Sequence, residues 1–231
     1  MFAAFLFYAV PSSAGSRSLG LPVDCTLGET CFIQNHVDRD PGPGHADFGC
    51  GALSHDGHKG TDFALHSLAE MQSGVAVLAA AAGTVLGLRD GMADEYFTPD
   101  MEATLDGRDC GNGVLIDHGD GWQTQYCHMK QGSIAVEPGQ TVATGDRLGQ
   151  VGLSGRTEFP HLHLSVRRDG ATIDPFQPHG GGACGDVKDA LWSDPIAYDP
   201  GGLIAAGFAA AVPDFADVKA GTAGVADIAD T

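Results

Sequence analysis

The chain has 231 residues, enough to bury a sizeable core as one principal domain. Its formal net charge of −18 and isoelectric point near 4.6 argue against a nucleic-acid partner and give no attraction to anionic membrane surfaces. Thirty-four glycines, twelve prolines and few apolar stretches at helical spacing indicate short strands and tight turns, so we expect a mostly β fold.

The beginning of the chain and the cysteines together indicate export. Residues 1–14 are apolar and end in small residues, as a signal peptide does, although the usual basic start is missing and a buried strand is the alternative. The segment is too short to span a membrane as a mature helix. Six cysteines without a C-x-x-C pair favour disulfides, and of the fifteen possible pairings we expect Cys25–Cys31, Cys110–Cys127 and Cys50–Cys184. We therefore predict a periplasmic or extracellular protein.

The next segment, residues 15–56, is rich in turn formers, and we expect a disulfide-tied arm with little regular structure. It leads to the segment 57–65, where a loop feeds a short strand. This arrangement places His58 at the entrance of the strand and Asp62 inside it. An imidazole and a carboxylate four residues apart form the first cluster of candidate ligands.

The middle of the chain is predicted to contain most of the regular structure. We expect the one clear helical turn at 67–74, and two strands within 75–88, divided at the Ala/Gly break. The acidic stretch 90–111 is expected to be an irregular surface insertion that rims a groove.

A hairpin is predicted where Gly119-Asp120-Gly121 separates two alternating runs, 113–118 and 122–128. By the two-residue period of a strand, Thr124, Tyr126 and His128 would share one face and Cys127 would take the other. Cys127 is therefore a poor ligand candidate if His128 faces a site.

Two histidines in one alternating run form the second candidate cluster. His161 and His163 are two residues apart, so in a strand they leave the same face. A pair of ordinary half-buried histidines is the alternative. A catalytic zinc ion, however, takes three protein ligands and keeps one position for water. His58, Asp62 and one of these two histidines would supply that set.

The main domain is expected to span residues 57–178, followed at 179–231 by a linker and an appendage rich in Ala, Gly and Asp. His118 lies at the shoulder of the hairpin, where a structural role is expected. His55 is a weaker candidate ligand than His58. Four histidines lie outside the motifs and are expected at the surface or in loops: His36, His45, His66 and His179.

In its motifs the chain resembles the lysostaphin-type, or LytM-like, zinc endopeptidases. The resemblance covers residues 57–175 and rests on H-x(3)-D at His58 and Asp62, H-x-H at His161 and His163, and supporting patterns between them, such as Tyr126-Cys127-His128-Met129. The resemblance implies an antiparallel two-sheet β fold with an open groove. It also implies one zinc ion bound by His58, Asp62 and His163, with His161 as general base and His128 orienting water or stabilising the oxyanion.

The implied activity is hydrolysis of peptide cross-links of bacterial cell-wall peptidoglycan by a metal-activated water, with the peptidoglycan peptide stems as the partner. The alternative is a non-catalytic module of this fold that activates a cell-wall amidase or scaffolds wall remodelling. Members of that kind are expected to have lost metal ligands, and this chain keeps them. The strand departs from the family pattern after the second histidine, where Leu164 and Ser165 replace the common aromatic and acidic residues.

Overall fold

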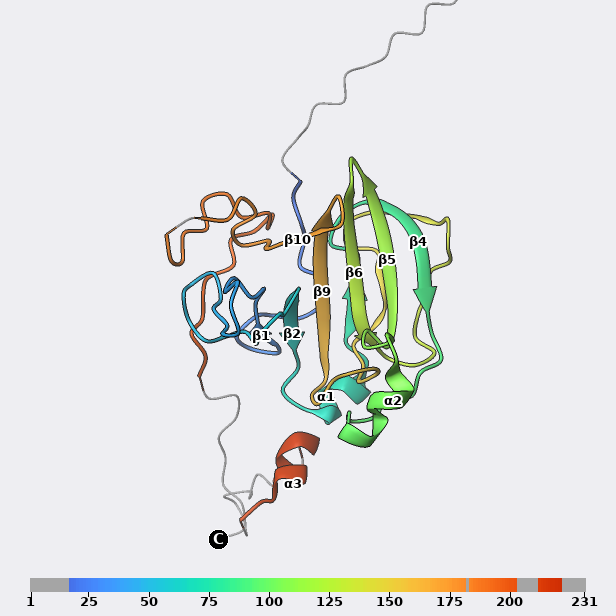
Figure 1. Cartoon of the computed structure of the whole chain (residues 1–231). Helices are drawn as coiled ribbons and strands as arrows, with labels where there is room; N and C mark the ends of the chain where they lie inside the picture. The colour runs from blue at the N-terminus through green and yellow to red at the C-terminus, as the bar shows by residue number, and fades with distance from the viewer. Residues whose placement is uncertain (1–16, 182, 203–211, 222–231) are drawn as a thin grey trace, which may run out of the picture.

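The computed structural model describes residues 17–181, 183–202 and 212–221. An eight-stranded antiparallel sheet forms most of the molecule, in the order β1-β2-β9-β6-β5-β4-β7 with β10 paired to β9, and a smaller sheet pairs β3 with β8 (Figure 1). The predicted mostly β, two-sheet antiparallel fold is confirmed. The strands are β1 Phe32–Asn35, β2 Thr61–Ala64, β3 Ala76–Leu78, β4 Gly83–Arg89, β5 Asn112–Gly119, β6 Trp122–Met129, β7 Thr141–Val142, β8 Arg147–Gln150, β9 His161–Arg168 and β10 Ala171–Ile173.

The helices are short and lie at one end of the large sheet (Figure 1). The predicted helical turn is α1, Leu68–Ser73, which begins because the Ser67 side chain accepts from the Glu70 amide and ends at Gly74 in a left-handed conformation. The sequence had suggested a single clear helical turn, and that expectation is wrong. The 3-10 turn η1 and two further helices are also present: η1 Pro99–Met101, α2 Glu102–Leu105 and α3 Phe215–Ala220. No helix in the described part of the chain is long and apolar enough to cross a membrane.

The β5–β6 hairpin supplies two of the three eight-residue strands of the sheet, and its turn is the one predicted. Asp120 and Gly121 both have positive φ, 51° and 77°, as a two-residue hairpin of the I′ kind requires. His118, on the shoulder, is hydrogen-bonded to the Ala82 carbonyl and the Thr124 hydroxyl, which gives it the expected structural role.

The two faces of β9 separate the core from the face that carries the candidate site. Leu162, Leu164 and Val166 are buried in the core, which also contains Val77 and Leu148 of the small sheet. The alternate residues of β9 therefore point to the opposite face of the large sheet.

The described part of the N-terminal arm contains little regular structure, as expected. Residues 32–35 form β1, which pairs with β2 at the edge of the large sheet, and Leu19 and Val23 are buried in the core. This short strand forms in a turn-rich segment because of its tertiary pairing with β2. The three expected disulfides are present, and one of them, Cys50–Cys184, ties the arm to a segment near the C-terminus.

The segment after residue 178 is partly packed against the rest of the chain. Leu191 and Trp192 are buried in the core, and the Leu191 amide donates to the Pro175 carbonyl. The apolar segment 1–14 and most of the tail beyond 202 lie outside the described residues. The proposed division of the chain into domains stays a prediction.

Candidate metal centre

His58, Asp62 and His163 converge from a loop and two neighbouring strands. The β2–β9 register places Asp62 directly opposite His163, and His58 lies in the loop that enters β2. His163 Nδ1 lies 2.8 Å from Asp62 Oδ1, and His58 Nε2 lies 3.2 Å from the same oxygen. His58 and Asp62 are buried, and His163 is half-buried.

The donor atoms have the spacing that a bound metal ion requires. His58 Nε2 and His163 Nδ1 are 3.1 Å apart, and one ligand atom from each residue of the cluster lies within 4.8 Å of the others. Ligands about 2.0–2.1 Å from a tetrahedral metal are separated by roughly 3.3 Å, so these atoms are spaced like neighbours in one coordination shell. Two imidazole nitrogens and a carboxylate oxygen also form a common ligand set for divalent transition metals.

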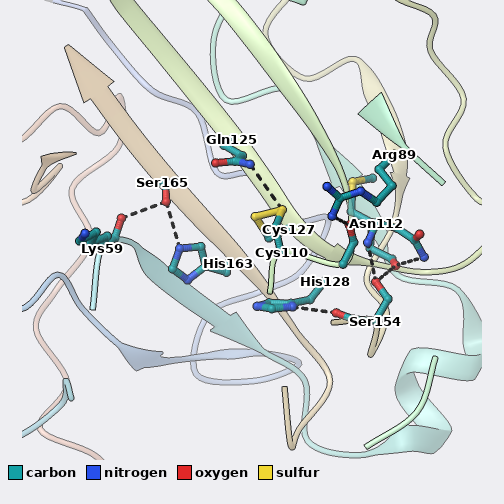
Figure 2. Close-up of a disulfide and its surroundings, with 12 residues drawn as sticks. Lys59, Arg89, Cys110, Asn112, Gln125, Cys127, His128, Ser154, His163 and Ser165 are labelled. Carbon is teal, nitrogen blue, oxygen red and sulfur yellow. Dashed lines mark hydrogen bonds between the residues drawn. A yellow bond between two sulfur atoms is a disulfide. The ribbon is translucent and has the colours of Figure 1, made fainter. Parts of the chain in front are cut away.

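The nitrogens that face away from the cluster are held by hydrogen bonds. His58 Nδ1 donates to the His36 carbonyl at 2.7 Å. His163 Nε2 donates to Ser165 Oγ at 3.0 Å, and that hydroxyl donates to the Lys59 carbonyl at 2.9 Å (Figure 2). These bonds place the N–H of each ring outside the cluster and leave a lone pair on the nitrogen that faces it.

The carboxylate is held in the same way, since Asn35 Nδ2 donates to Asp62 Oδ2 at 3.0 Å. Burial alone would raise the pKa of Asp62, but the surrounding imidazoles, above all His161 and His163, hold it well below its usual range. Burial would likewise lower the pKa of His58, but the hydrogen bond and charge of Asp62 outweigh it and raise that pKa. The cluster thus keeps its carboxylate ionised, as a metal ligand must be.

His161 lies beside the cluster. Its Nδ1 donates to the Phe159 carbonyl at 2.8 Å, and its Nε2 lies 3.6 Å from Asp62 Oδ1. Burial lowers the pKa of His161 despite the nearby charge of Asp62. The ring is therefore a neutral imidazole whose free lone pair faces the cluster.

His128 lies on the other side of His161, with ring centroids 4.7 Å apart. Its Nδ1 donates to the Ser154 carbonyl at 2.8 Å (Figure 2). Burial, and then the neighbouring rings of His161 and His163, lower the pKa of His128 well below its usual value. Its Nε2 is therefore also a hydrogen-bond acceptor.

The path of β6 near His128 differs from the sequence prediction. His128 has a φ of 60°, and the β5–β6 register shifts between Asn112 and Val114, so the two-residue alternation ends there. Alternation along β6 places Tyr126 in the core and Cys127 in the groove, and the bulge turns His128 into the groove as well. The expectation that Tyr126 and His128 share a face is wrong, because a bulge changes the direction of the strand. Cys127 is bonded to Cys110 and is no ligand.

The cluster lies in a groove of about 780 Å³. The stretch 90–111 contributes Phe97, Asp109 and Cys110 to its lining, as predicted for a rim, but it is not wholly irregular as expected, because it contains η1 and α2. His55 is exposed and lines the groove, but it does not belong to the group of converging ligand atoms.

Sequence reasoning missed the residues that orient the ligands. His36, expected at the surface or in a loop, is buried against the edges of Phe48 and Phe176, with ring centroids 5.0 and 4.8 Å away. It contributes a backbone carbonyl, which any residue type carries, so no residue-type pattern reveals it. Asn35 and Ser165, by contrast, act through their side chains, which residue type does reveal. Only Ser165 lies in the strand that carries the H-x-H motif.

Comparison with known proteins identifies a family whose profile covers the region that carries this site. The profile of "Peptidase family M23" matches residues 56–175. The cell division protein DipM of Caulobacter vibrioides is 37% identical over 68 residues, 29% of this chain and 11% of that protein. The peptidoglycan DD-endopeptidase ShyA of Vibrio cholerae is 37% identical over 67 residues, 29% of this chain and 15% of that protein.

Among solved structures, a zinc-containing peptidase from Vibrio cholerae aligns with 69% of this chain and 39% of its own, with a TM-score of 0.46 and 24% identity. The matches to DipM and ShyA cover less than a fifth of the length of either protein. The family match contains all five residues of the cluster and its flanking histidines: His58, Asp62, His128, His161 and His163.

Proposed function

The chain belongs to peptidase family M23, and from that membership and the geometry of the cluster we propose a zinc-dependent endopeptidase that cleaves peptide cross-links of bacterial cell-wall peptidoglycan. The observation that carries the proposal is the convergence of three donor atoms from His58, Asp62 and His163 with the spacing of one coordination shell. Names of curated relatives, such as a peptidoglycan DD-endopeptidase, supply the substrate class.

In this proposal His58 Nε2, Asp62 and His163 Nδ1 hold the zinc ion. Zinc held by three protein ligands lowers the pKa of a water molecule to about 7 and polarises the carbonyl of the bond to be cleaved. The remaining requirements are met by side chains of the groove, which bind the peptide and move protons.

His161 is the proposed general base. Its Nδ1–H is fixed on the Phe159 carbonyl, so Nε2 has a free lone pair on the side of the cluster. Burial keeps the ring neutral, which makes it able to take a proton from the attacking water at neutral pH. The same nitrogen then returns the proton to the leaving amine.

His128 is proposed to orient the water. With Nδ1–H fixed on the Ser154 carbonyl, its Nε2 accepts a hydrogen bond and has no proton to donate in the resting state. Of the two roles that the family resemblance implies, accepting from the water therefore fits this geometry better than donating to an oxyanion.

The alternative is a module without turnover that activates a cell-wall amidase or scaffolds wall remodelling. A module of that kind has no need for three converging ligands or for two neutral imidazoles beside them. We favour the enzyme because separate hydrogen bonds hold the three proposed ligands: His58 donates to the His36 carbonyl, Asn35 donates to Asp62, and His163 donates to Ser165.

We also propose that the protein is exported to the periplasm or cell exterior. Three disulfides among the described residues support an oxidising compartment. Residues 1–14 would provide the signal, residues 15–56 the arm, 57–178 the peptidase domain and 179–231 the linker and appendage.

The test combines metal analysis with product identification. Purified protein should contain one zinc ion per chain and should release new amine termini from peptidoglycan sacculi, detected by mass spectrometry. Asp62→Ala should lose both zinc and products, whereas Asp189→Ala, an exposed carboxylate outside the groove, should keep both. Stoichiometric zinc with no products from sacculi or defined muropeptides would refute the endopeptidase, and absence of zinc would favour the non-catalytic module.

A further inference from the structure

The groove continues along β9 beyond the metal cluster. Four alternate residues of the strand line it: His161, His163, Ser165 and Arg167. Since a strand rises about 3.3 Å per residue, the Cα of Arg167 lies roughly 13 Å along the strand from that of His163. The floor of the groove thus extends past the ligands by about the length of a short extended peptide.

The guanidinium of Arg167 leans back toward the cluster. Its Nη2 donates to Gln125 Oε1 at 2.6 Å, and Gln125 lies opposite Ser165 in the β6–β9 register. Gln125 Nε2 in turn donates to Cys110 Sγ at 3.5 Å, on the disulfide with Cys127 (Figure 2). The charged group is therefore held over the Ser165 end of the groove by an amide that is itself fixed.

Arg167 and Lys59 carry positive charges that no acidic side chain neutralises. Among the described residues, neither forms an ion pair with a carboxylate, although both line the groove. The third cation of the groove, Arg156, pairs with both Glu102 and Asp109.

Two unneutralised cations lining one groove are unexpected in a chain with a net charge of −18. A guanidinium has five N–H donors, and Gln125 is hydrogen-bonded to one nitrogen of Arg167. Ser165 Oγ donates to the Lys59 carbonyl, so the Lys59 loop adjoins the same end of the groove (Figure 2). The donors that remain match a carboxylate in charge and geometry.

We propose that Arg167, with Lys59 of the same groove, binds a free carboxylate of the substrate and makes the enzyme selective for acidic peptides. The proposal rests on the endopeptidase function proposed above and names a specificity-determining residue for it. Since Gln125 draws the guanidinium back to the level of Ser165, the carboxylate would lie within about two extended residues of the cleaved bond.

A purely structural role for Arg167, as a link between β9 and β6, is the competing explanation. The two explanations differ in what they predict for a pair of peptides that are identical except that one has a carboxylate where the other has a carboxamide. A structural link acts equally on both peptides, whereas a carboxylate subsite acts on the acidic peptide alone.

The experiment compares these two peptides with zinc-loaded wild type, Arg167→Met, Arg167→Lys and Arg168→Met. Arg168 is the matched control because it is the next residue, is exposed, pairs with Asp169 and does not line the groove. We expect Arg167→Met to lower kcat/KM for the acidic peptide by about tenfold to hundredfold and to leave the amide peptide within about threefold. Arg167→Lys should lose less, and Arg168→Met should change neither value.

Binding is measured separately in excess chelator, with fluorescently labelled forms of both peptides and with wild type, Arg167→Met or Lys59→Met. The wild type should bind the acidic peptide more tightly than the amide, with an affinity that falls as salt rises, and Lys59→Met should lose part of this preference. Lys59 is exposed, so its substitution is not expected to impair folding.

The outcomes separate the two proposals. If wild type and Arg167→Met treat the two peptides alike in cleavage and in binding, the carboxylate subsite is wrong and the endopeptidase stands. If neither peptide nor peptidoglycan is cleaved, but chelated protein still prefers the acidic peptide through Arg167, the endopeptidase is wrong and the subsite stands.

Discussion

Replacing Gly60 with alanine tests whether packing around His163 positions the proposed metal ligands. Gly60 stands between His58 and Asp62 and is not among the glycines with positive φ, so alanine is allowed by the backbone there. A Cβ at this position would lie 2.5 Å from His163 Nε2 and 2.7 Å from the Leu164 carbonyl oxygen. The effect of the substitution is therefore steric.

The size of the effect follows from these distances. Comfortable contacts between heavy atoms are about 3.5–4.0 Å, so the imidazole or the backbone must move by roughly 1 Å. Neither moves freely, because His163 Nε2 is hydrogen-bonded to Ser165 and Leu164 is paired with Thr61 across the β2–β9 ladder. Overpacking of this kind destabilises by about 1–3 kcal/mol. Metal–ligand distances tolerate only about 0.2 Å, so we expect zinc affinity to fall at least tenfold.

Two measurements check this prediction. Zinc affinity is obtained by competition with a chromophoric chelator, and the free energy of unfolding is obtained by urea titration of zinc-free protein. Gly87→Ala in β4 is the control, because a Cβ there meets nothing within 4 Å and its φ is not positive. A Gly60→Ala protein that binds zinc within threefold of wild type would refute the reasoning.

Three further predictions concern the support of the site. Ser165→Ala removes the acceptor for His163 Nε2 and should weaken zinc binding by about tenfold to hundredfold with the fold retained. Competition titration measures the zinc affinity, and circular dichroism checks the fold. An unchanged zinc affinity would contradict the role assigned to Ser165. Burial lowers the pKa of His36 to about 4. Between pH 6.5 and 4 this histidine is therefore protonated in the unfolded state and neutral in the folded state. Zinc-free protein should lose about 3 kcal/mol of stability as pH falls through that range. In urea titrations at pH 7.5 and 4, His36→Phe should lack that loss, and an equal loss in both proteins would exclude His36 as its source. Replacing Cys110 and Cys127 together by alanine opens a loop with a sequence separation of 17 and should cost about 3 kcal/mol, and an unchanged urea midpoint would contradict it.

Much of the site could be predicted because it depends on local periodicity. His161 and His163 share a face because strands alternate with period two, and the hairpin followed from Gly119-Asp120-Gly121. The convergence of these histidines with Asp62, by contrast, depends on the β2–β9 register, which no local pattern fixes. The family resemblance supplied that information.

The features that could not be predicted are of two physical kinds. One is the bulge at His128, where a left-handed backbone at a residue other than glycine changes which neighbour faces the groove. The other is the set of acceptors for the ring N–H groups, which includes the backbone carbonyls of His36, Ser154 and Phe159. A carbonyl belongs to every residue, so its role depends on the fold and leaves no trace in residue type.

The hydrogen-bond partners of the proposed ligands also show that the candidate metal centre extends beyond the segment that matches the family. That segment begins at residue 56, yet the groups that fix His58 and the Asp62 carboxylate belong to His36 and Asn35 of the N-terminal arm. Orientation of a ligand by its outer hydrogen bond is typically worth tenfold to hundredfold in metal affinity. The arm, which pairs with β2 through β1 and is tied to the C-terminal segment by Cys50–Cys184, is therefore part of the structure that builds the site. Removing it would expose His58 Nδ1 to water and free the ring to turn, even though all three proposed ligands would remain in the chain.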